Sequence, residues 1–172
     1  MASRRSRIPA KTRAMADKVP MTPEGHVRLR EELKRLREVE APQVVKDIGT
    51  AREHGDLSEN AEYHAAKDRQ GMIVARINSI EQSLSRAEII DPSKLSGDKV
   101  QFGARVKLIN LGTEKEESFQ IVGPEEADIK VGRISGASPL ARALIGHKVG
   151  EEVTVVVPAG PRTYEIMEIS YG

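Results

Sequence analysis

The sequence predicts an α+β protein. An antiparallel α-helical coiled-coil hairpin is expected over residues 20–90, and a small antiparallel β domain with one short helix over residues 99–172. Three observations predict this fold: apolar residues mirror each other about one loop, a stretch rich in Ser, Gly and Pro forms a linker at residues 91–98, and the apolar period then changes to two. The aromatic fraction of 3% and the absence of Trp suit a coiled coil with a small domain better than one large core.

The first 19 residues are predicted to be a basic, disordered tail. Residues 1–20 carry six basic side chains against one acidic one, whereas the whole chain has a net charge of +1, so a basic tail precedes a mildly acidic body. A transit peptide is the alternative interpretation, and Met15 or Met21 is an alternative start. The absence of Cys excludes thiolate zinc sites and disulfides, and no stretch reaches the ~20 apolar residues of a membrane span.

The hairpin is predicted from two heptad-like series of apolar residues. They are Leu29, Leu33 and Leu36 in the first arm, and Ile77, Ile80 and Leu84 in the second. When the series are paired antiparallel, the residue numbers of every pair add to the same value, and the midpoint falls between Asp56 and Leu57. This mirror favours self-pairing within a monomer over an oligomerising coiled coil, and it predicts a turn in the acidic segment 55–60.

Local signals predict where the helices start and where they are irregular. Thr22-Pro23-Glu24 is typical of a helix start, because Thr caps free amides, Pro is tolerated in the first turn and Glu opposes the positive helix end. Ser58 is expected to cap the second helix. The apolar spacing between Leu36 and Val44 contains an extra four-residue step, a stutter, and Pro42 predicts a mild kink there.

Beyond the linker, alternating residues predict a sheet. The expected strands are Val100–Leu111, Ser118–Val122, Glu152–Val157 and Thr163–Ile169. One short helix is expected over residues 138–146, because Ser138 can cap it, Pro139 fits its first position and Gly146 can stop it.

The predicted turn of the hairpin carries two carboxylates, Asp56 and Glu59. Their spacing of three lets both face outward on one side, where they could share a hard cation such as Mg²⁺. Two carboxylates alone make a poor metal site, so a complete site would need ligands from a partner's acids or phosphates. The alternative, on spacing alone, is that both residues only cap the helix and solvate the turn.

The segment Ala51–Lys67, AREHGDLSENAEYHAAK, resembles the signature of the bacterial GreA/GreB transcript-cleavage factors, and is nearer to the GreA branch. The segment Pro20–Gly25 also fits the family, as do Ile134-Ser135 and Ser138–Gly146. Together these matches cover essentially residues 20–172. The tail departs from the family pattern.

The resemblance implies that the C-terminal domain is similar to the FKBP fold and docks on bacterial RNA polymerase. It implies that the hairpin enters the secondary channel and reaches the active centre of a backtracked elongation complex, close to the nascent RNA 3′ end. There the polymerase cleaves the RNA, which rescues the arrested complex. The protein is then expected to be a cytoplasmic accessory factor without enzymatic activity of its own, in contact with DNA and RNA of the elongation complex and with no membrane.

The resemblance also assigns residues. Asp56 and Glu59 match the family's tip acids, which help to hold a Mg²⁺ shared with the polymerase and to organise the attacking water; no stably bound cofactor is expected. Arg52 matches a basic position near the tip that meets the extruded RNA. Tyr63 and Lys67 are further candidate RNA contacts, with packing on the hairpin and a solvated helix face as the alternatives.

Alternatives remain for one surface of the hairpin and for the function of the protein. Lys67 with Arg69 and Arg76 forms a candidate basic strip for RNA phosphates, or else a solvated helix face. An inhibitor that binds the secondary channel on the same scaffold, without stimulating cleavage, is the competing function, and a self-assembling structural coiled coil is a third.

Overall fold

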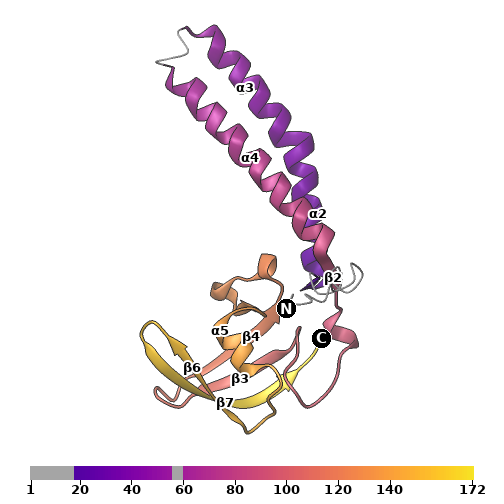
Figure 1. Ribbon diagram of the computed structural model, residues 1–172, viewed down its shortest axis with the longest axis vertical. Coiled ribbons are helices and arrows are strands. Elements are labelled where there is room, and N and C mark those ends of the chain that lie inside the picture. Colours follow the sequence, from indigo (N-terminus) through magenta and orange to yellow (C-terminus); the bar gives the residue numbers. More distant parts are fainter. Residues whose placement is uncertain (1–17, 56–59) are drawn as a thin grey trace, which may run out of the picture. The chain divides into compact units, whose positions relative to one another are not determined.

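The computed structural model describes residues 18–55 and 60–172. The chain divides into two compact units, one of His26–Arg86 and one that joins the segment ending at Gly25 to Ala87–Gly172. The first unit is helical and the second holds the sheet (Figure 1), which confirms the predicted α+β class. No helix in the described part of the chain is long and apolar enough to cross a membrane.

The first arm of the hairpin consists of α2 (Pro23–Arg35), the π-helical turn η1 (Leu36–Glu40) and α3 (Ala41–Glu53). In η1 the Ala41 N–H bonds the Leu36 carbonyl, five residues back. Pro42 follows at once and lacks the N–H that an α-helix would donate to Glu38. The predicted irregularity is therefore in the right place, but the structure has a π turn where the spacing predicts a stutter with a kink.

The second arm is the unbroken helix α4 (Ala61–Arg86), which lies side by side with α3 (Figure 1). Buried residues form one line on each arm: Leu29, Leu36, Val44, Ile48 and Ala51 on the first, and Ala66, Ile73 and Ile80 on α4. The line on α4 has a spacing of seven, whereas Leu36 and Val44 are eight apart across the π turn. The extra residue of that turn keeps both leucine and valine on the side that faces α4.

The second unit contains a five-stranded sheet in the order β5-β4-β3-β7-β6. Its strands are β3 (Arg105–Asn110), β4 (Glu116–Val122), β5 (Arg133–Ser135), β6 (Glu152–Val157) and β7 (Gly160–Ser170). All pairs are antiparallel except β4 with β5. That pair is parallel because the chain crosses between the two strands through the 3₁₀ turns η3 (Pro124–Glu126) and η4 (Ile129–Val131) instead of reversing in a hairpin.

The short helix α5 (Pro139–Leu144) packs on this sheet through Ala141 and Leu144, which are buried among strand residues such as Leu108 and Ile166. Ser138 Oγ accepts from the Ala141 N–H at 3.2 Å, so the predicted cap is confirmed. The complete buried cluster is Val100, Ala104, Val106, Leu108, Ile121, Ile134, Ala141, Leu144, Val153, Val155, Tyr164 and Ile166.

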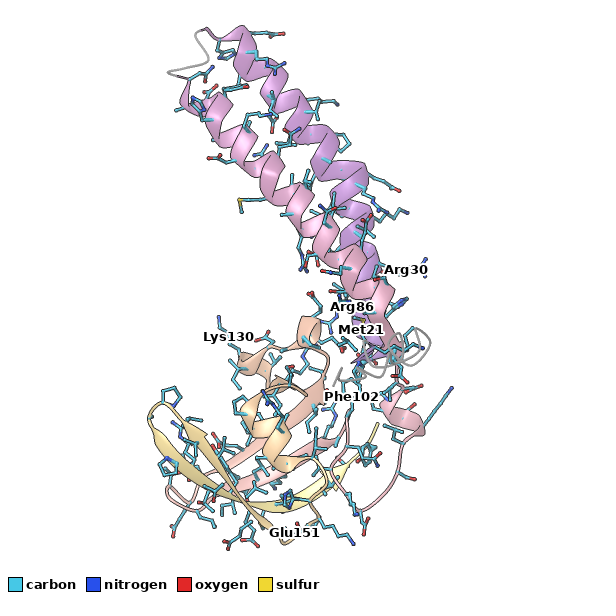
Figure 2. The ribbon with its side chains drawn as sticks, viewed as in Figure 1. Met21, Arg30, Arg86, Phe102, Lys130 and Glu151 are labelled. Atoms are coloured by element: carbon cyan, nitrogen blue, oxygen red, sulfur yellow. The ribbon has the colours of Figure 1, made fainter. Side chains whose placement is uncertain are left out.

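A second sheet has two strands, one before α2 and one after α4. Strand β1 (Val19–Met21) pairs in parallel with β2 (Ala87–Ile89), and the Ile90 N–H donates to the Met21 carbonyl at 2.9 Å. Met21, labelled in Figure 2, is buried. After β2, the 3₁₀ turn η2 (Pro92–Lys94) leads toward the main sheet.

Candidate functional site at the hairpin tip

The hairpin tip is the stretch in which α3 ends and α4 begins. The His54 N–H bonds the Ala51 carbonyl at 3.2 Å as α3 closes. The predicted carboxylates Asp56 and Glu59 lie outside the described residues, and so does Ser58. The assignment of the two carboxylates therefore stays a prediction.

Asn60 caps α4 and joins the two arms at the tip. Its Oδ1 accepts from the Tyr63 N–H at 3.1 Å, and its Nδ2 donates to the Ala51 carbonyl at 2.6 Å. The described start of α4 at Ala61 makes Asn60 its N-cap, whereas the cap was expected at Ser58, which lies outside the described residues. An amide carries both an acceptor and donors, so Asn60 can serve both arms at once. The sequence signal was available, since Asn is itself a preferred N-cap residue.

Two of the candidate RNA contacts lie together beside this cap. The guanidinium carbon of Arg52, on α3, is 5.8 Å from the centroid of the Tyr63 ring on α4, within the range of a cation–π contact. Tyr63 is half-buried and meets the His64 ring edge-on, with centroids 5.5 Å apart. Lys67, one turn further along α4, is exposed, and its Nζ donates to Gln70 Oε1 at 3.3 Å.

A contact between His54 and Glu62 also spans the tip. His54 Nδ1 at the end of α3 lies 3.8 Å from Glu62 Oε2 in the first turn of α4, and both side chains are exposed. Within residues 18–55 and 60–172, no group of three or more His, Asp or Glu side chains is arranged to hold a metal ion.

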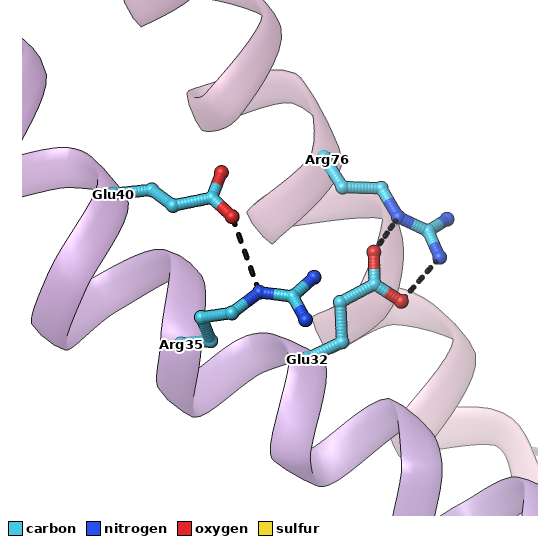
Figure 3. Close-up of polar contacts among 4 residues, drawn as sticks. All are labelled: Glu32, Arg35, Glu40 and Arg76. Carbon is cyan, nitrogen blue, oxygen red and sulfur yellow. Dashed lines mark hydrogen bonds and ion pairs between the residues drawn. The ribbon is translucent and has the colours of Figure 1, made fainter.

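Two members of the candidate basic strip bind acids of the opposite arm. Arg76 donates from Nε and from one terminal nitrogen to the two oxygens of Glu32, at 2.7 and 2.9 Å (Figure 3). Arg69 forms an ion pair with Asp47. Both arginines are therefore paired with acids of the first arm, whereas the exposed Lys67 donates to the neutral side chain of Gln70.

These contacts also lower the pKa values of the paired acids. The hydrogen bonds from Arg76 hold the pKa of Glu32 below its ordinary value. The pKa of Asp47 is lowered first by a hydrogen bond from Gln43 and then by Arg69. On the first arm Arg35 Nε lies 3.1 Å from Glu40 Oε1, a pair with the five-residue spacing of the π turn (Figure 3).

Known proteins resemble this chain over nearly its whole length. Residues 19–89 match the family described as "Transcription elongation factor, N-terminal", and residues 95–171 match "Transcription elongation factor, GreA/GreB, C-term". The transcription elongation factor GreA of Thermodesulfovibrio yellowstonii is 54% identical over 157 residues, which is 91% of this chain and 99% of the relative. GreA of Rhizobium leguminosarum bv. viciae is 54% identical over 158 residues, which is 92% of this chain and 100% of the relative.

Among solved structures, the GreA factor homolog 1 (Gfh1) protein of Thermus thermophilus is 34% identical and covers 88% of this chain and 98% of its own, with a TM-score of 0.41. The assignment rests on the sequence matches and not on this superposition. The two family matches together span most of the chain, and both halves are present in the relatives that are 54% identical. The chain therefore belongs to the GreA/GreB family of transcription elongation factors.

Proposed function

We propose that this protein binds bacterial RNA polymerase and stimulates the polymerase's own cleavage of the 3′ end of backtracked RNA. The observation that carries the proposal is the tip segment Ala51–Lys67 with Asp56 and Glu59 in its turn, in a chain 54% identical to proteins named transcription elongation factor GreA. In this proposal the β unit docks on the polymerase, the hairpin enters the secondary channel, and the protein is an accessory factor.

Asp56 and Glu59 are the residues proposed to act at the reacting bond. Carboxylate oxygens are ligands that Mg²⁺ accepts while it keeps several waters. A Mg²⁺ shared with the polymerase would help to stabilise the attacking and leaving oxygens of phosphodiester hydrolysis. One of the two carboxylates would also orient the attacking water, which requires a reach of about 2.6–3.2 Å to its proton.

The described frame of the tip supports this role. Asn60 bonds both the Ala51 carbonyl and the first turn of α4, so the last turn of one arm and the first turn of the other are held together. A fixed frame reduces the entropy that must be lost when groups at the end of a long arm are placed against a substrate.

Arg52, Tyr63 and Lys67 are proposed to contact the nascent RNA. The Arg52 guanidinium can bind a phosphate through two nitrogens, and the Tyr63 ring offers a face on which a base can stack. Arg52 and Tyr63 contact each other, so both groups lie on one side of the tip. The exposed Lys67 adds a positive charge one helical turn after Tyr63.

The experiment uses a backtracked elongation complex of a bacterial RNA polymerase with labelled RNA, to which the purified full chain is added. We expect the RNA to shorten, and we expect Asp56→Asn and Glu59→Gln to abolish the stimulation while the variants still compete with the wild type for polymerase. Glu53→Gln, the same change of charge at the end of α3, is the matched control and should cleave normally. Wild-type cleavage by the Asp56 and Glu59 variants would contradict the proposed chemistry.

The same assay separates the competing function. An inhibitor on this scaffold would bind the polymerase and slow nucleotide addition, but it would leave the backtracked RNA uncut at every protein concentration. That result with the wild-type chain would replace cleavage stimulation by channel inhibition.

A further inference from the structure

The first turn of α2 is held by a buried carboxylate from a distant part of the chain. Thr22 is the N-cap, and the Gly25 N–H donates to its Oγ1 at 3.2 Å. Glu126, at the end of η3 and 104 residues away in sequence, accepts the Thr22 N–H at 3.0 Å through Oε2 and the Thr22 hydroxyl through Oε1. Thr22 is 2% exposed and Glu126 is 6% exposed.

This geometry is a capping box with one part supplied from elsewhere. In a capping box, the N-cap side chain accepts from the N3 amide, and a Glu at N3 reaches back to the N-cap amide. Here the N3 residue is Gly25, which has no side chain to reach back. A Cβ at Gly25 would lie 2.3 Å from both Cδ and Oε1 of Glu126, so the carboxylate of Glu126 fills the space that an N3 side chain would use.

The same carboxylate also serves its own turn. The Gly123 N–H, at the start of η3, donates to Glu126 Oε2 at 2.9 Å. A Cβ at Gly123 would lie 2.7 Å from the Pro20 carbonyl oxygen, so a larger residue there would push the segment before Thr22 away from Glu126. Two amides and one hydroxyl thus satisfy the buried charge, which is the condition under which a buried carboxylate is tolerated.

We propose that Glu126 is a positioning residue that completes the capping box of α2 and thereby ties the first turn of the hairpin helix to the η3 turn of the β unit, and that full cleavage activity requires this tie. The grouping of the segment up to Gly25 with the β unit agrees with it. The functional part of this inference rests on the proposed function, whereas the structural part is tested without polymerase.

The structural test is amide hydrogen exchange and thermal unfolding of the full chain. Glu126→Ala removes the acceptor of two buried amides, so exchange at Thr22 and Gly123 should accelerate by at least about tenfold, and the thermal midpoint should fall by about 4 °C or more. Glu126→Gln keeps one oxygen for the amides and an NH₂ that can donate to the Thr22 hydroxyl, so it should retain most of the protection. Unchanged exchange at Thr22 in Glu126→Ala would overturn the inference.

Glycine substitutions provide a matched pair. Gly25→Ala places a methyl group where the carboxylate lies, and it should reproduce the fast exchange of Glu126→Ala. Gly49→Ala, also in a helix of the first arm, meets nothing within 4 Å and should leave exchange at Thr22 unchanged. Equal effects of the two substitutions would show that Glu126 is not the reason for a glycine at position 25.

The decisive variant moves the glutamate into the helix. Gly25→Glu combined with Glu126→Ala rebuilds an ordinary capping box within α2 but removes its tie to η3. We expect exchange at Thr22 to return toward the wild-type rate, while exchange at Gly123 stays fast and the maximal cleavage rate stays at least about fivefold low at saturating protein. Full recovery of cleavage in this variant would overturn the tie and reduce Glu126 to a helix cap.

Failure of this inference is distinguishable from failure of the proposed function. If the wild-type chain cleaves no RNA, the proposed function fails, but exchange at Thr22 still tests the capping box. If Glu126→Ala needs more protein for half-maximal cleavage yet reaches the wild-type maximal rate, the contact acts on docking and the positioning role is refuted.

Discussion

The two units of the molecule are stabilised in different ways. In the β unit, twelve buried residues from all five strands, α5 and the segment before β3 pack into one cluster. In the helical unit, the buried residues form a single line along each arm, flanked by ion pairs such as Arg76 with Glu32. The comparison shows that the sheet depends on three-dimensional packing, whereas the hairpin depends on helix continuity and on contacts between the surfaces of its arms.

The largest expected effect is in the β cluster. Ile166 on β7 is fully buried, so Ile166→Ala leaves a cavity bounded by several elements and should cost about 2–5 kcal/mol of unfolding free energy. Chemical denaturation followed by a probe of the sheet measures this loss. A cost below about 1 kcal/mol would mean that the cluster can collapse around the cavity.

The same change in the hairpin should cost less. Ile73 lies on the buried line of α4, but solvent-exposed residues flank that line, so side chains can relax into the space and the cost should lie near the low end, about 2 kcal/mol. Helical circular dichroism in denaturant measures it. Equal losses for Ile73→Ala and Ile166→Ala would remove the contrast between the two units.

Helix continuity can be strengthened at Gly71, inside α4. A Cβ at Gly71 meets nothing within 4 Å, so Gly71→Ala should stabilise the hairpin by about 0.5–1 kcal/mol. The change should raise the helical unfolding midpoint and leave the sheet probe unchanged. A destabilised hairpin would show that α4 needs a glycine there for a reason other than space.

The smallest effect concerns the ion pair of Glu32 with Arg76 and its dependence on pH. The pKa of Glu32 is lowered from 4.5 in the folded chain, chiefly by the hydrogen bonds from Arg76. Its contribution is therefore fully present above that ordinary value and is lost as the pH falls through the lowered one. Glu32→Gln should cost about 0.5 kcal/mol at pH 7, with the difference from wild type shrinking below pH 4.5.

The control for this titration is Glu31→Gln, which removes a neighbouring exposed acid on the same helix. If the Glu31 and Glu32 variants change stability equally at every pH, the effect comes from the net charge of the arm and not from the pair with Arg76.

Features encoded locally could be predicted from the sequence. Thr22 and Ser138 cap the helices that they were expected to cap, and β6 has the predicted bounds, Glu152–Val157. The reversal of the hairpin was predictable as well, because three apolar residues on each arm mirror each other over about two helical turns. Each of these signals lies within a few residues of the element it specifies or recurs along it.

Features that depend on distant partners could not be predicted. Strands β1, β2 and β5 have three residues each, too few for a period, and they exist because a neighbour pairs with them. The acids that bind Arg69 and Arg76 lie 22 and 44 residues away in sequence, so the basic strip could not be told from a structural face. At the tip, Arg52 and Tyr63 could be proposed from the motif, but their mutual contact required the fold.

The π turn at Leu36–Glu40 sets the rotational phase of everything beyond it on the first arm. Each residue of an α-helix advances the direction of its side chain by about 100°. Loss of one residue from this turn would therefore rotate α3 against α2 and carry Val44 and Ile48 out of line with α4, together with Arg52 near the tip. The direction in which Arg52 faces at the end of α3 therefore depends on a residue count in one turn far from it.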